Sequence, residues 1–219
     1  MTGVVLVHGL WSEPRHFDLV AEDLRAEGVE VAVPELHRGS LEADTAVVQA
    51  EVDAMGPPPI VVGHSYGGSV ITGLTGAAHL VYLAAYAPDE GESAASLGSS
   101  EELAAAITRV DRGVTALDPA KAVAALYQDC PPDLVQRAVD LLRPQVMACP
   151  KGSPVRQAWR EVPSTYVVCD QDRTVDPDLQ RRMAQRCDTE LTWPSGHCPF
   201  LSRPDLVLEL IEELSAFED

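Results

Sequence analysis

The chain has 219 residues, of which 46% are hydrophobic, enough to bury a substantial core in one folded domain. Its formal net charge of −18 argues against nucleic acid or an anionic membrane surface as a partner, because both attract basic patches. No uninterrupted apolar segment approaches the ~20 residues that are needed to span a bilayer.

Strand-like and helix-like runs alternate along much of the chain. The expected strands are short and rich in β-branched residues, and they cover 4–8, 29–33, 60–63, 79–83, 165–169 and 190–193. Helical patterns fit between them at 14–26, 42–55, 66–75, 177–185 and 204–217, and several open on a proline. This alternation predicts βαβ units and a parallel sheet with helices on both faces.

The stretch from about 89 to 162 breaks the alternation. Helix-like segments at 101–110, 119–127, 133–142 and 153–159 follow one another here, separated by proline and glycine. Because the stretch falls between the fourth and fifth predicted strands, we treat it as an insertion within a single domain of residues 1–219.

The segment 61–68, with the sequence VVGHSYGG, joins the third predicted strand to the next helix. It places G-x-S-x-G between an apolar strand and a helix, which is the signature of a nucleophile elbow. Such a sharp turn pushes the serine hydroxyl outward, and the free N–H groups at the start of the helix suit an oxyanion. The motif predicts covalent catalysis by Ser65, provided that an acid and a base lie downstream.

Both partners follow later strands in the expected order of serine, acid and histidine. His197 lies in the loop after the strand 190–193 and is the predicted general base. Asp170, Asp172 and Asp176 follow the strand 165–169, and each is a candidate for the acid that orients the histidine.

Together these blocks resemble the α/β-hydrolase superfamily, most of all the small branch that includes plant hydroxynitrile lyases and methyl esterases. The resemblance is carried by 4–9, 63–68, 82–88, 168–172 and 195–197, so it covers nearly the whole chain outside 89–162. It implies an α/β-hydrolase fold in which 89–162 forms a helical cap over the active site. The antiparallel strands that usually open this fold have no counterpart before Val4, so we expect a reduced six-stranded parallel sheet.

The resemblance also assigns roles to residues. The D-Q-D of related proteins places the acid at the second aspartate, which favours Asp172, with Asp170 as its rival. An oxyanion hole is expected from the backbone N–H groups of Leu10 and Tyr66.

Several positions narrow the chemistry. A haloalkane dehalogenase would carry aspartate in place of Ser65. Related hydroxynitrile lyases typically carry threonine at the position of Gly9 and, at that of Cys198, a lysine that helps to hold cyanide. These departures favour ester hydrolysis over cyanohydrin cleavage.

Candidate pocket residues come from loops and from the expected cap, and they are Trp11, Tyr86, Tyr127, Trp159 and Cys198. The five cysteines form neither a C-x-x-C pair nor a zinc-binding spacing, so we expect free thiols and no metal site. No cofactor is implied.

The sequence therefore predicts a carboxylesterase-type serine hydrolase that cleaves a small uncharged ester through an acyl-enzyme on Ser65. Two alternatives stay open: a lyase or cyclase that uses the triad only as acid–base groups, and a non-catalytic, ligand-binding member of the family. The chain enters its first strand at Val4 without a basic or apolar leader, so we expect a cytoplasmic protein. A homodimer is compatible with the sequence, which does not fix the oligomeric state.

Overall fold

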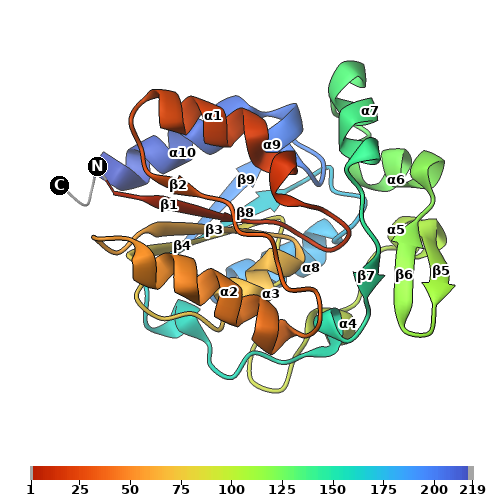
Figure 1. Cartoon of the computed structure of the whole chain (residues 1–219), viewed down its shortest axis with the longest axis horizontal. Coiled ribbons are helices and arrows are strands. Elements are labelled where there is room, and N and C mark those ends of the chain that lie inside the picture. Colours follow the sequence, from red (N-terminus) through yellow and green to blue (C-terminus); the bar gives the residue numbers. More distant parts are fainter. Residues whose placement is uncertain (1, 217–219) are drawn as a thin grey trace.

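The centre of the fold is a six-stranded sheet with the strand order β2-β1-β3-β4-β8-β9 (Figure 1). We describe it from a computed structural model, which covers residues 2–216. The strands are β1 (Val4–Val7), β2 (Val31–Ala32), β3 (Ile60–His64), β4 (His79–Leu83), β8 (Ser164–Cys169) and β9 (Thr189–Trp193). All neighbouring strands pair in parallel, which confirms the reduced parallel sheet, although β2 is shorter than predicted.

Alternate residues of each central strand pack into two separate hydrophobic cores, one on each face of the sheet. In β1, Val4 and Leu6 belong to one core, whereas Val5 and Val7 belong to the other. Successive side chains of a strand point to opposite faces, and helices cover both faces here, so the strand is apolar throughout. The register pairs Val5 with Val61 of β3, which continues the same alternation across the sheet.

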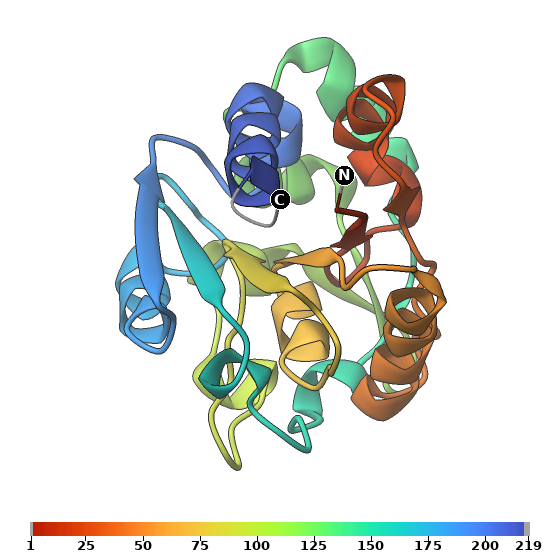
Figure 2. The same ribbon diagram turned by 90° about the vertical axis from the view of Figure 1, so that its left-hand side faces the viewer.

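Helices form a layer on each side of the sheet (Figure 2). One layer holds α1 (Asp18–Ala26), α9 (Pro199–Ser202) and α10 (Pro204–Ala216), and the other holds α2 (Leu41–Ala54), α3 (Tyr66–Ile71) and α8 (Pro177–Ala184). Their first turns carry the expected signals, because Ser40 caps α2 and Asp176 caps α8 just before a proline. The last residue of the predicted final helix, Phe217, lies outside the described residues. Within residues 2–216, no helix combines the length and apolarity needed to cross a membrane.

A long insertion between β4 and β8 lies beyond the carboxyl ends of the sheet strands (Figure 1). Its elements are α4 (Ala94–Leu97), α5 (Glu101–Ala106), β5 (Ile107–Asp111), β6 (Val114–Leu117), α6 (Pro119–Leu126), α7 (Pro132–Asp140) and β7 (Gln145–Val146), with 3₁₀ turns at Cys149–Lys151 and Ala158–Arg160. We call this insertion the cap.

The prediction of a wholly helical cap is wrong, because β5, β6 and β7 form a three-stranded antiparallel sheet. The predicted helix 101–110 ends at Ala106, where the alanine-rich run gives way to β-branched residues that continue as β5. The predicted helix 153–159 is also absent. Only the turn Ala158–Arg160 forms there, and Val155, near the start of the pattern, is exposed instead of packed.

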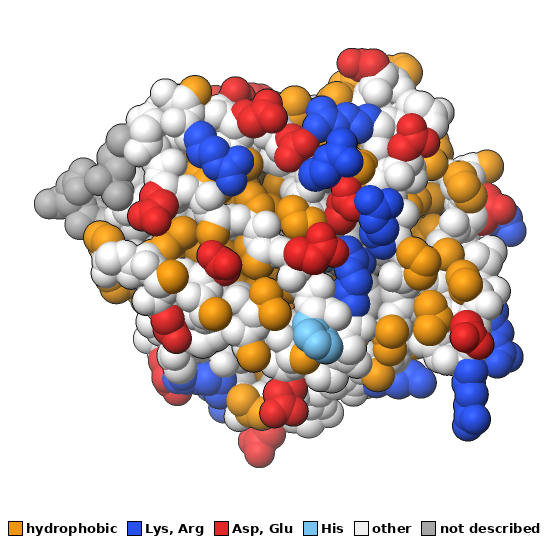
Figure 3. Space-filling model, viewed as in Figure 1, with side chains coloured by type: hydrophobic (Ala, Val, Ile, Leu, Met, Phe, Trp, Pro, Cys, Tyr) orange, Lys and Arg blue, Asp and Glu red, His pale blue; other side chains and the backbone are white. Residues whose placement is uncertain are grey.

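Polar contacts hold the cap against the rest of the chain. The backbone N–H of Arg143 donates to the carbonyl of Trp11 at 2.7 Å, and ion pairs join Arg137 to Asp18 and Arg143 to Glu13. Figure 3 shows basic side chains gathered in a band on this face with acidic side chains beside them. Partly exposed ion pairs such as that of Arg137 contribute little each, and cap residues such as Leu103, Leu117 and Leu126 add apolar contacts in the core.

The close packing around the start of α3 gives a first prediction. A Cβ atom at Gly67 would lie 2.4 Å from the carbonyl oxygen of Val7, which belongs to the sheet and cannot move aside. Gly67→Ala is therefore expected to lower the free energy of unfolding by roughly 1–3 kcal/mol, measured by urea denaturation. Gly56→Ala is the matched control, because no atom of the described residues lies within 4 Å of a Cβ atom there. Equal stability of the two variants would contradict this account.

Candidate active site

Ser65 occupies a strained turn between β3 and α3. Its backbone has φ 54° and ψ −121°, in a region that residues with a side chain rarely adopt. Hydrogen bonds hold the turn on both sides: the Ser65 N–H donates to the Leu83 carbonyl at 3.2 Å, and the Tyr86 N–H donates to the Ser65 carbonyl at 3.0 Å. The serine side chain faces a cavity, and its hydroxyl makes no hydrogen bond with another described residue. It is therefore free to meet a ligand.

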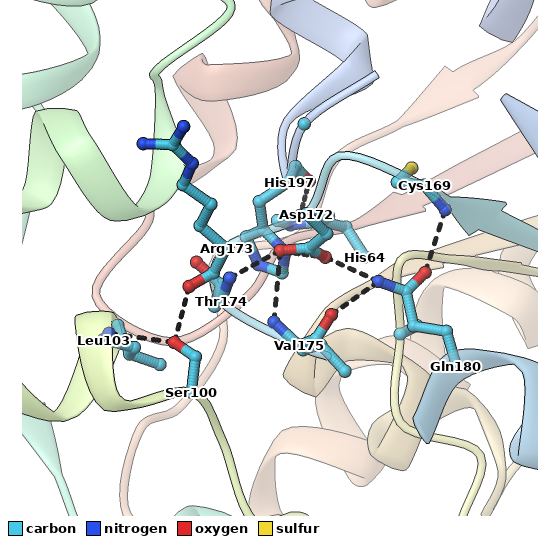
Figure 4. A network of polar contacts seen from close by, with 12 residues as sticks. His64, Ser100, Leu103, Cys169, Asp172, Arg173, Thr174, Val175, Gln180 and His197 are labelled. Atoms are coloured by element: carbon cyan, nitrogen blue, oxygen red, sulfur yellow. Dashed lines mark hydrogen bonds and ion pairs between the residues drawn. The ribbon is translucent and has the colours of Figure 1, made fainter. Parts of the chain in front are cut away.

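His197 lies in the loop after β9, and its ring lines the same cavity as Ser65. The ring is buried, and its Nδ1 lies 2.8 Å from Oδ2 of Asp172 (Figure 4). The other ring nitrogen, Nε2, is left to exchange a proton with a group in the cavity. Serine, histidine and aspartate from three separate strand ends are thus brought to one place, in the expected chain order.

Several donors fix the orientation of the Asp172 carboxylate. Oδ1 accepts the N–H groups of Thr174 at 2.6 Å and Val175 at 3.1 Å, and Oδ2 accepts the side-chain amide of Gln180 at 2.7 Å (Figure 4). Gln180 is itself fully buried on α8 and accepts the Cys169 N–H. The other two candidate acids, at positions 170 and 176, are exposed, and the second of them caps α8 instead.

His64 lies against His197 and hydrogen-bonds to its backbone. Its Nε2–H donates to the backbone carbonyl of His197 at 2.8 Å, and the two rings lie 4.6 Å apart. Burial, followed by the neighbouring His197, keeps the pKa of His64 well below the ordinary value of 6.5. A neutral His64 therefore holds the loop of His197 in place without adding a positive charge beside it.

The two residues predicted to form an oxyanion hole come from the start of α3, directly after Ser65, and from the loop after β1. Tyr66 is the first residue of α3, so its N–H has no acceptor within the helix, while its hydroxyl donates to Asp44 at 2.7 Å in the core. Leu10 lies in the loop after β1 and lines the cavity with Ser65. A side chain at Gly9 would crowd Ser65, because a Cβ atom at position 9 would lie 3.0 Å from the Cβ atom of Ser65.

A second cavity adjoins the first and extends it under the cap. Leu10, Trp11, Tyr86 and Leu103 line both cavities. The tyrosine hydroxyl donates to the Gly98 carbonyl at 2.8 Å, so its ring forms a fixed wall. No Asp, Glu, Lys or Arg of the described residues lines either cavity.

The comparison with known families agrees with this geometry. Residues 4–210 match the model of the alpha/beta hydrolase family. The chain belongs to the alpha/beta hydrolase family. The family prediction made from the motifs is thereby confirmed, and so is the fold class.

Individual relatives of this hydrolase span its whole length. An alpha/beta hydrolase of Aspergillus novofumigatus is 28% identical over 235 residues, covering 95% of this chain and 94% of the relative. Among solved structures, a pyrethroid hydrolase from Sphingobium faniae superposes with a TM-score of 0.86 at 23% identity, covering 98% of this chain and 97% of the other. A methylesterase from Arabidopsis superposes with a TM-score of 0.80 at 20% identity, covering 99% and 100%.

Three of the five expected pocket residues of the hydrolase lie elsewhere. Tyr127 is buried in the core with its hydroxyl 3.3 Å from His16, and Cys198 is buried in the same core, where burial raises the pKa of its thiol. Trp159 packs on the far side of the sheet and donates to the Pro88 carbonyl at 3.2 Å. Only Trp11 and Tyr86 line the cavities.

Other residues that were not predicted from the sequence also line the cavity. They are the cap residues Leu103 and Leu126 and the acid-loop residue Thr174. The sequence does not show whether a leucine on an amphipathic helix lines a cavity or packs in the core. The position of Thr174, two residues after Asp172, could have suggested that Thr174 lines the cavity. In the described part of the hydrolase, no group of three His, Cys, Asp or Glu side chains is arranged to hold a metal ion.

The buried histidines give a prediction for pH. Burial lowers the pKa of His8 to about 3 and that of His16 to about 4, against 6.5 in an unfolded chain, so the unfolded state binds more protons in this window. Stability is therefore complete above pH 6.5 and falls as the pH drops toward 4. At pH 5 each of the two histidines should lower the free energy of unfolding by about 2 kcal/mol relative to its value at pH 7.5, as measured by urea unfolding across this pH range.

A variant without one of the two groups provides the control. His16→Gln cannot gain a proton, so its free energy of unfolding should depend less steeply on pH than that of the natural chain. A free energy of unfolding that stays constant from pH 7.5 to pH 5 would contradict the assignment of neutral buried histidines.

Proposed function

We propose that this chain is a serine hydrolase that cleaves a small uncharged carboxylic ester through an acyl-enzyme on Ser65. One observation carries the proposal: the strained serine shares a cavity with His197, whose far nitrogen is held by Asp172 at 2.8 Å. A serine hydroxyl is a weak nucleophile at neutral pH, and an imidazole oriented by a carboxylate is what activates it.

The reaction proceeds in two halves. His197 takes the proton from the Ser65 hydroxyl as its oxygen bonds to the ester carbonyl carbon, and the oxyanion accepts the N–H groups of Leu10 and Tyr66. The imidazolium then returns the proton to the departing alkoxide, which leaves as an alcohol. Water, deprotonated by His197, attacks the acyl-enzyme in the same way and releases the carboxylic acid. Asp172 stabilises the imidazolium in both halves and keeps its charge.

The cavity walls support an uncharged and largely apolar substrate. Trp11, Tyr86 and Leu103 offer ring and alkyl surface next to Ser65, and no charged side chain of residues 2–216 is available there to pair with an ionic group. The cap supplies much of this wall, so we treat it as the substrate-binding insertion of a single hydrolase domain. The names of the pyrethroid hydrolase and the methylesterase point to the same class of chemistry.

The decisive variant removes the nucleophile. Ser65→Ala should reduce release of p-nitrophenol from p-nitrophenyl butyrate by at least about 10³-fold, because no acyl-enzyme can form. The thermal midpoint should change little, since the hydroxyl makes no hydrogen bond with another described residue. A fluorophosphonate probe should label the natural chain at Ser65 and leave the variant unlabelled, as read by mass spectrometry.

Ser69→Ala is the matched control, because Ser69 lies on α3, four residues after Ser65, and its buried hydroxyl has no hydrogen-bond partner among residues 2–216. It should retain labelling and turnover. Ester cleavage that survives in Ser65→Ala would reject the acyl-enzyme. A natural chain that is neither labelled nor active on short esters would favour the lyase or ligand-binding alternatives instead.

A further inference from the structure

The turn after α6, at residues 128 and 129, reaches from the cap to both loops that carry the candidate catalytic residues. The Asp129 carboxylate accepts the N–H of Gly196, directly before His197, at 2.6 Å. The side-chain amide of Gln128 donates to the carbonyl of Gln171, directly before Asp172, at 2.9 Å. We call Gln128 and Asp129 the clamp, because two adjacent side chains of the cap hold two separate loops.

Gly196 makes this approach possible. A Cβ atom at that position would lie 2.4 Å from Oδ1 of Asp129 and 2.4 Å from Nε2 of Gln128. The clamp therefore lies directly against the backbone of the histidine loop, and any side chain would displace it. The two loops also bond to each other, because the Gln171 N–H donates to the Ser195 carbonyl at 3.1 Å.

The cap forms further hydrogen bonds with the loop that carries Asp172, which we call the acid loop. With the loop that carries His197, the histidine loop, its described side chains form one hydrogen bond. The Ser100 N–H donates to the Thr174 carbonyl at 3.0 Å, and the Thr174 hydroxyl donates to the Ala125 carbonyl at 2.9 Å. Of the cap side chains in the described residues, only Asp129 hydrogen-bonds to the segment 194–198. This carboxylate is therefore the side-chain hydrogen bond through which the described part of the cap holds the histidine loop.

We propose that Asp129 is a positioning residue for His197, which fixes the ring over Ser65 by holding the Gly196 N–H. The inference rests on the proposed function. A hydrogen bond from an amide to a carboxylate is shorter and stronger than one between neutral groups, which suits a contact that must hold a loop in one orientation. Displacing a catalytic group by about 1 Å can cost about 10²-fold in rate.

The test is the series Asp129→Ala and Asp129→Asn, measured with p-nitrophenyl butyrate. Asp129→Ala should lower kcat by about tenfold to hundredfold with KM within about twofold, because His197 is misplaced while Asp129 itself lines neither cavity. Asp129→Asn keeps an acceptor oxygen at the same place and should recover most of kcat. The rate of fluorophosphonate labelling at Ser65 should follow the same order.

Asp118→Ala is the matched control. Asp118 lies at the other end of α6, where its carboxylate caps the helix by accepting the Lys121 N–H at 3.0 Å, far along the chain from the clamp. It should lower the thermal midpoint and leave kcat unchanged. If Asp118→Ala lowers kcat as much as Asp129→Ala does, or if Asp129→Ala has the kcat and labelling rate of the natural chain, the positioning role is overturned.

A spectroscopic readout separates this inference from the proposed function. In chain labelled with ¹⁵N-histidine, the proton between His197 Nδ1 and Asp172 should shift or broaden in Asp129→Ala and return in Asp129→Asn. This measurement needs no turnover, so it decides the positioning role even if the natural chain cleaves no ester. An unchanged resonance in Asp129→Ala would reject the inference while leaving the hydrolase proposal intact.

Discussion

The candidate site depends on how tightly the chain around Ser65 is packed. A residue with a side chain occupies its φ of 54° only where the surrounding structure holds it there. Here the N–H and the carbonyl of Ser65 are both bonded to the strand and loop beside it, and Gly67 lies against the carbonyl of Val7. These contacts join β1, β3 and β4 in one rigid corner. The Ser65 hydroxyl is consequently held at the carboxyl end of the sheet, where the loops after β1, β8 and β9 begin.

This arrangement explains why the centre of the site could be predicted from the sequence. Ser65 lies in a motif whose glycines, strand and helix are all neighbours in the chain, so local residues define its geometry. Asp172 and His197 have no such motif, but each follows an apolar strand, and the carboxyl ends of parallel strands meet at one edge of a sheet. Chain order and strand ends therefore predicted that an acid and a histidine lie near Ser65, whereas the choice of Asp172 among three aspartates came from the family resemblance.

The cap could not be predicted in the same way, because contacts between distant segments decide its structure. Residues 101–111 contain an alanine-rich run followed by β-branched residues, and the local pattern does not show that the second half pairs with β6. Tyr127 and Cys198 satisfy the composition of a pocket and of a core equally well, and the core contains both. Gln180 resembles an ordinary polar helix residue until α8 packs beside β8 and its buried amide meets Asp172.

The contacts of the cap also bear on how a ligand reaches Ser65. Ser100, Thr174 and the clamp join the cap to both catalytic loops, so a cap that swung open as a rigid body would break all of these hydrogen bonds together. The second cavity offers a route that breaks none of them, because it runs from Trp11 and Tyr86 to the exposed residues Gly98 and Ser99. The cap is thus both a wall of the two cavities and a support for the loops that carry Asp172 and His197. Under the proposed function, this groove selects an ester for its shape and hydrophobicity while the loops that carry Asp172 and His197 stay in place.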